Sequence, residues 1–152
     1  GFLATTIGDL SADLDKDGQV SLLEAWLTAA RRTAAFYEQE GRLATEHSLL
    51  DDNGDAKGTQ ADWFRGLQVT KKSAEEGLLP DGLRAHQLHL IPSESERKLS
   101  PSQRAKRDAL ELELARLRTK KSKLELETYY ERLEKLLLEM SHIYFHDDES
   151  SD

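Results

Sequence analysis

The chain has 152 residues, of which 38% are hydrophobic and 33% are charged, and its formal net charge at pH 7 is -8. This length suffices for one ordinary domain or two small ones. The chain has no cysteine, which excludes disulfides, thiolate metal sites and cysteine nucleophiles, and no apolar run approaches the roughly eighteen residues of a membrane span.

The first predicted element is a helix over residues 2–12, because Phe2, Ile7 and Leu10 recur at rough helical spacing. Gly8 weakens this helix. The segment has no basic flank before its apolar part, so it does not have the pattern of a signal peptide. The chain begins with glycine instead of methionine, so we expect it to be a processed product or a fragment of a longer protein.

Residues 13–24, DLDKDGQVSLLE, have the ligand spacing of an EF-hand calcium loop. Calcium takes about six to eight oxygen ligands, and a loop of this length must curl around the ion to supply them. Gly18 permits the sharp turn, and the apolar Val20 suits pairing with a second loop through a short strand. The alternative is an acidic solvated turn. The predicted ligands are Asp13, Asp15, Asp17, the Gln19 carbonyl, Ser21 and Glu24.

A strong helix is predicted from Leu22 to about Glu40, where apolar residues recur every three or four positions. Gly41 is expected to end it. Trp26 lies on the apolar face, so we expect it in the core and not in contact with a ligand.

A second calcium loop is predicted over residues 51–62. Ala56 stands at position 6, where a positive φ costs a residue with a Cβ on the order of 1 kcal/mol. Asp62 at position 12 is one methylene shorter than glutamate, so this site is expected to bind calcium more weakly or to tolerate magnesium. The alternative is a turn that caps the next helix. The predicted ligands are Asp51, Asn53, Asp55, the Lys57 carbonyl, Thr59 and Asp62.

The segment after this loop is predicted to contain a short helix over 61–68, a linker over 70–84 and an extended piece that stops at Pro92. His86 and His89 have the spacing of a zinc-binding pair. Without a cysteine or a well-placed third ligand, packed or solvated histidines are the better interpretation.

The last unit is predicted to begin at Ser100 with a capping box and a proline at the first helical position. A first helix runs to about Lys121. A second apolar stripe follows, in which alternating spacings of three and four are typical of a coiled coil. The two stripes are out of phase, which favours a turn near 122–127 and an antiparallel helical hairpin, with one continuous rod as the alternative. The second stripe comprises Tyr130, Leu133, Leu137, Met140 and Tyr144, reinforced by Tyr129, Leu136 and Ile143.

No catalytic constellation is evident, so the chain itself is predicted not to be an enzyme. Carboxylates with calcium spacing would be occupied by the ion and make poor general bases. His142 and His146 lie four residues apart, but no further metal ligand accompanies them. The basic stretch 104–123 lacks stacking aromatics, which argues against nucleic-acid binding.

The chain contains the run from ADLDKDGQVSLLEAW to GRLATEHSLLDDNGD and the stretches ADWFRG, DGLRAHQLHLIPS and ETYYERLEKLLLEM. Together they resemble the C-terminal region of bacterial legumain-type (caspase-like) cysteine peptidase homologues. In that group the catalytic histidine and cysteine lie in an α/β domain, which would be upstream of Gly1. The resemblance therefore implies a calcium-dependent appendage of a peptidase-like domain, with no catalytic residue in this chain, and an exported, periplasmic or extracellular location.

These expectations combine into a mostly α fold, in which an EF-hand-like helix-loop-helix pair is followed by an antiparallel helical hairpin. The expected function is a calcium-binding structural or scaffolding module with a protein partner. The alternative is a regulatory or stabilising C-terminal part of a legumain-type peptidase, whose upstream domain would be the partner. A dockerin-like ligand is a weaker third possibility. The expected domains are 1–75 (calcium-binding pair), 76–98 (linker), 99–146 (hairpin) and 147–152 (disordered acidic tail).

Overall fold

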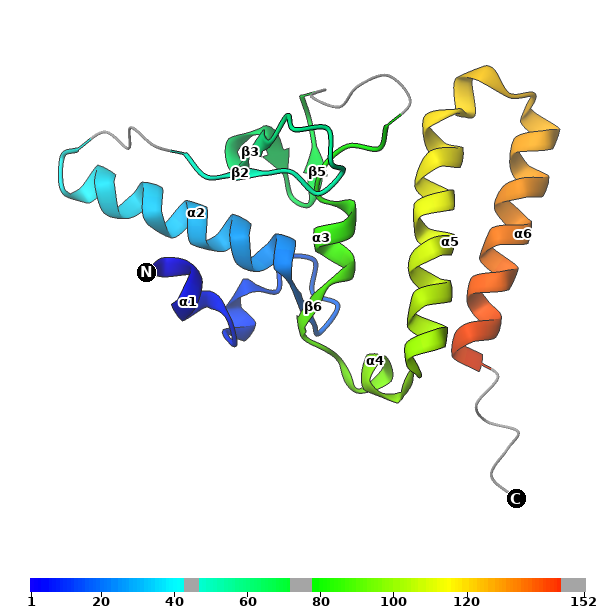
Figure 1. Cartoon of the computed structure of the whole chain (residues 1–152), viewed down its shortest axis with the longest axis horizontal. Coiled ribbons are helices and arrows are strands. Elements are labelled where there is room, and N and C mark those ends of the chain that lie inside the picture. Colours follow the sequence, from blue (N-terminus) through cyan, green and yellow to red (C-terminus); the bar gives the residue numbers. More distant parts are fainter. Residues whose placement is uncertain (43–46, 72–77, 146–152) are drawn as a thin grey trace. The chain divides into compact units, whose positions relative to one another are not determined.

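The structure is a computed structural model that describes residues 1–42, 47–71 and 78–145 (Figure 1). The fold is mostly α, as expected, and its strands are short and antiparallel. The chain divides into two compact units, with the boundary between Glu94 and Ser95. His146 and the predicted tail 147–152 lie outside the described residues. None of the helices in the described parts has the length and hydropathy that a membrane span requires.

The first unit consists of short helices and strand pairs around one long helix, α2. Its helices are α1 (Phe2–Thr6), the 3-10 turn η1 (Leu10–Ala12), α2 (Leu22–Gln39), the 3-10 turn η2 (Ala61–Trp63) and α3 (Leu83–Gln87). Its strands are β1 (Val20–Ser21), β2 (Leu49–Leu50), β3 (Thr59–Gln60), β4 (Phe64–Arg65), β5 (Gln68–Val69) and β6 (His89–Ile91).

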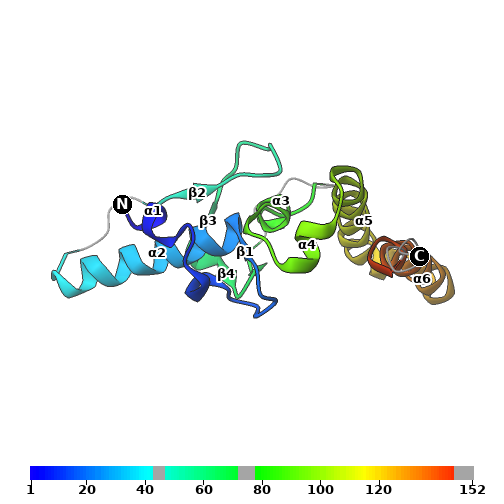
Figure 2. The same cartoon turned by 90° about the horizontal axis from the view of Figure 1, so that it is seen from below.

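The segment before the first loop is broken in two, where the sequence predicted one helix over 2–12. The break lies at Gly8, whose φ of 93° ends α1 before the turn of η1 begins. Both pieces contact α2 (Figure 2). Arg32 of α2 holds them through a 2.7 Å ion pair with Asp9, and this contact lowers the pKa of the Asp9 carboxyl to about 2.

The core of the first unit forms along the apolar face of α2, which runs almost as predicted. Leu23 and Leu27 are buried there with Trp26, whose indole ring packs edge-on against Phe64 at 5.8 Å. The indole N–H of Trp26 donates to the Ser48 hydroxyl at 3.0 Å. Trp26 is therefore a core residue, as expected.

The strand pairs differ from the expected pairing of two calcium loops. Val20 of β1 pairs with Ile91 of β6, and not with the second loop. There Leu50, just before the loop, pairs with Thr59 within it, in β2 and β3. Burial explains this choice, since Val20 packs with Leu90 and Ile91 in a small apolar cluster.

The predicted helix over 61–68 is wrong. Only one 3-10 turn, η2, forms there, and β4 and β5 then pair with Phe64 opposite Val69. Gly66 lies between these strands with a φ of 61°, a value that glycine adopts without strain but that interrupts a helix. Burial of Phe64 against Trp26 fixes the strand in place.

The second unit begins within α4 (Glu94–Lys98), at Ser95, and contains α5 (Pro101–Thr119), the 3-10 turn η3 (Lys121–Lys123) and α6 (Leu126–Phe145). The predicted capping box at Ser100 is confirmed, because the Ser100 side chain accepts from the Gln103 N–H and the Gln103 side chain accepts from the Ser100 N–H. Helices α5 and α6 lie side by side (Figure 1).

The buried face of α6 combines residues from both of the predicted apolar sets. Tyr130 and Leu137 are about half exposed, whereas Tyr129 and Ile143 of the reinforcing set are buried. The two sets are adjacent on the helix, and the facing apolar residues of the unit determine which of their side chains are buried. Ile143 shares a cluster with Leu99 and Leu110, against which Leu136 and Met140 pack.

Candidate metal centre

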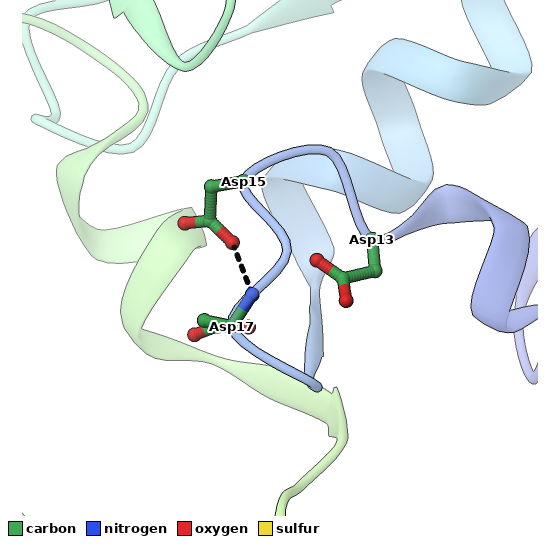
Figure 3. Close-up of side chains that lie close together, drawn as sticks. All are labelled: Asp13, Asp15 and Asp17. Atoms are coloured by element: carbon green, nitrogen blue, oxygen red, sulfur yellow. Dashed lines mark hydrogen bonds between the residues drawn. The ribbon is translucent and has the colours of Figure 1, made fainter.

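The first predicted loop brings three carboxylates together. Asp13, Asp15 and Asp17 each offer an oxygen, and these oxygens lie within 4.8 Å of one another (Figure 3). Backbone N–H groups hold the side chains: Asp13 accepts from Lys16 at 2.7 Å and from Gly18 at 3.1 Å. Asp15 accepts from the Asp17 N–H at 3.3 Å. The loop thus has the inward curl that its spacing predicts.

The two predicted loops share a backbone signature. At positions 4 and 6, φ is positive in both: 66° and 81° at Lys16 and Gly18, and 81° and 59° at Gly54 and Ala56. Positive φ at these positions turns the chain so that short side chains at positions 1, 3 and 5 can accept from N–H groups of the same loop. In the second loop Asp51 accepts from Gly54, Asn53 from Asp55, and Asp55 from Lys57, each at 2.9 Å.

Glu24, at position 12, is not one of the three converging carboxylates, but its buried side chain closes the loop. Its side chain is only 1% exposed. One carboxylate oxygen accepts from the Leu14 N–H at 2.8 Å, and the other accepts from the Ser21 N–H and hydroxyl, each at 2.8 Å. Ser21 and Glu24 also form the capping box that begins α2. Glu24 therefore ties position 2 to position 9 and both of them to the helix.

Negative charge accumulates at this centre. Burial raises the pKa of the Asp15 carboxyl, and the charges of Asp17 and Glu24 raise it further. His86 lies 3.4 Å from Asp15 and acts in the opposite direction on that pKa. A bound cation would relieve the repulsion, since it favours the ionised form of every carboxylate around it.

Gln19 connects the first loop to the end of β6. Its side-chain N–H donates to Asp17 at 3.0 Å, and its side-chain oxygen accepts from the Ser93 N–H at 3.1 Å. These contacts use the side chain, so they leave the predicted role of the Gln19 backbone carbonyl as a prediction.

The second loop lacks a comparable carboxylate group among the described residues. Asp51 and Asp55 accept hydrogen bonds from N–H groups within the loop, and Thr59 of the same loop is buried. Asp62, the predicted position 12, has an exposed side chain in η2. The structure therefore does not bring Asp62 into a place equivalent to that of Glu24.

Asp81 and Asp52 are polar residues of this site that the sequence did not reveal. Asp81 is 2% exposed, and burial raises the pKa of its carboxyl. Asp52 accepts from the Gly82 N–H at 2.9 Å and from the Ala85 N–H at 2.7 Å, which fixes the start of α3. The pair Asp81-Gly82 was the only available signal, and such a pair equally marks an exposed turn.

Replacement of Ala56 by glycine is expected to stabilise the chain by about 0.5 to 1 kcal/mol. The left-handed conformation of Ala56 costs roughly 1 to 2 kcal/mol, and the greater unfolded-state entropy of glycine offsets part of the gain. Urea unfolding of Ala56→Gly measures the difference. Ala35→Gly is the matched control: Ala35 is exposed within α2, so its replacement should destabilise by about 0.5 to 1 kcal/mol. An equal loss of unfolding free energy in the two variants would show that the backbone at Ala56 is not strained.

Comparisons of the chain with protein-family models, with curated proteins and with solved structures gave no match.

Proposed function

We propose that this protein is a nonenzymatic calcium-binding module with two EF-hand-type loops, in which α5 and α6 form an antiparallel helical hairpin that docks on a protein partner. The observation that carries the proposal is the convergence of Asp13, Asp15 and Asp17 within 4.8 Å on a loop whose sequence has calcium spacing. Several hard carboxylate oxygens placed this close together match the ligand preference of calcium.

In the stronger site, the three aspartates supply the first ligands, and the Gln19 carbonyl, Ser21 and Glu24 complete the shell. Glu24 sits at the first turn of α2 and contacts the start of the loop. An ion held by both regions would fix α2 relative to η1. The weaker site uses the second loop, whose ligands Asn53 and Thr59 are neutral and whose position 6 is strained.

A structural role is favoured over a sensor role. Calcium sensors expose a groove rich in methionine when they open, and this chain has a single methionine, Met140, which packs against the core of the second unit. The exposed aromatic residues Tyr130, Tyr144 and Phe145 on α6 support a protein partner, because such residues are enriched at protein interfaces.

Calorimetric titration of the full chain with calcium tests this function. One tight and one weaker binding event are expected. Tryptophan fluorescence should change in parallel, because Trp26 lies in the core next to the first loop and Trp63 follows the second loop directly. Absence of binding heat, together with an unchanged emission spectrum in millimolar calcium, would reject the proposal.

A further inference from the structure

The two loops are closed by carboxylates in the same way, although one of these carboxylates lies outside its loop. In the first loop, Glu24 accepts from the N–H of Leu14 at position 2 and from the hydroxyl of Ser21 at position 9. In the second loop, Asp81 accepts from the N–H of Asp52 at position 2, at 3.1 Å, and from the hydroxyl of Thr59 at position 9, at 2.6 Å.

Further contacts strengthen the correspondence. The same Asp81 oxygen that accepts from Asp52 also accepts from the Asn53 N–H at 3.3 Å. Both closing carboxylates are almost fully buried, at 1% exposure for Glu24 and 2% for Asp81, whereas the side chain of Asp62 is exposed. A buried carboxylate must be compensated by donors, and here the donors are groups of the second loop.

We propose that Asp81, and not Asp62, is the residue that closes the second loop, as a positioning residue that holds Asp52, Asn53 and Thr59 in place for the ion. This inference rests on the proposed calcium function for its consequence, but its structural part stands on contacts that exist without an ion.

The contacts of Asp81 attach the second loop to a chain segment, residues 79–93, that also contacts the first loop. Residues 79–93 begin at Leu79, whose carbonyl accepts from the Asn53 side chain at 3.0 Å. They continue through α3 to β6, which pairs with Val20 of the first loop. Asp81 therefore anchors the second loop to the strand that completes the first one, which takes the place of direct pairing between the loops.

The test compares three variants of the full chain: Asp81→Ala, Asp81→Asn and Asp62→Ala. Asparagine keeps an oxygen for the two N–H groups and an amide that can donate to Thr59, so it should preserve the positioning. Alanine removes these contacts. Asp81→Ala should speed hydrogen exchange at the Asp52 and Asn53 amides by about tenfold or more and weaken the second calcium event by a similar factor. Asp81→Asn and Asp62→Ala should change these exchange rates and the affinity of the second calcium event by no more than about threefold.

The variants distinguish a failure of the role proposed for Asp81 from a failure of calcium binding by the second loop. A larger loss of calcium binding in Asp62→Ala than in Asp81→Ala would overturn the proposal. So would equal losses in Asp81→Asn and Asp81→Ala, because the charge of Asp81 would then matter and its contacts would not. If the unaltered chain shows no second calcium event, the calcium function of that loop fails, and amide exchange alone still decides the role of Asp81. Should Asp81→Ala lose its helical circular dichroism, Asp81→Ser replaces it, with exchange expected between the alanine and asparagine values.

Discussion

Glu24→Gln is expected to abolish the tighter calcium event. Glutamine lacks the charge and one of the two acceptor oxygens, and its amide group would face N–H and O–H donors that Glu24 now satisfies. The affinity should fall by about a hundredfold or more, towards the millimolar range of weak sites. The calcium-free chain should also lose about 2 kcal/mol of stability, because hydrogen bonds to a buried carboxylate are disrupted.

Calcium titration and urea unfolding measure these two effects separately. Glu38→Gln is the matched control, since Glu38 lies on the same helix with an exposed side chain, and both quantities should remain unchanged there. A Glu24→Gln chain that still binds calcium with the original affinity would show that the ion does not use position 12.

Arg107→Ala is expected to cause the largest loss of stability in the second unit. Arg107 is 3% exposed and joins three helices: it pairs with the buried Glu96 of α4, with Asp108 of α5 at 2.7 Å, and with the hydroxyl of Tyr144 of α6. Burial disfavours its charge, but hydrogen bonds to Asp108 and Glu96 outweigh this and raise the pKa of the guanidinium. Removal of the cation from such a buried pair typically costs about 3 to 5 kcal/mol.

Thermal unfolding followed by helical circular dichroism should show a lowered transition, by about 10 °C or more. Lys106→Ala, one residue away and exposed, should shift it by no more than a few degrees. The double variant Arg107→Met with Glu96→Leu should recover much of the loss, because well-packed apolar residues often replace a buried ion pair without cost. If Arg107→Ala behaves like Lys106→Ala, the ion pair does not hold these helices together.

The sequence was most informative where ligand spacing, turn chemistry and helix capping agreed within a few residues. The first loop and α2 follow one another in this way, and the capping box at Ser100 has both of its predicted hydrogen bonds. Each of these signals depends on neighbours in the chain, so a single sequence contains the necessary information.

Contacts between distant residues could not be read in the same way. Pairing of Val20 with Ile91, and capture of the second loop by Asp81, join residues far apart in the chain. The buried face of α6 is a related case: Tyr129 and Tyr130 are equally apolar candidates, and only packing within the second unit determines which one is buried. Local propensity cannot distinguish alternatives that tertiary packing decides.

Crystals of the full chain grown in millimolar calcium would test calcium binding by the first loop most directly. We expect anomalous density for one ion between the carboxylates of Asp13, Asp15 and Asp17, with the Glu24 side chain within ligand distance. Well-ordered density in which these side chains point into solvent around an empty centre would contradict it.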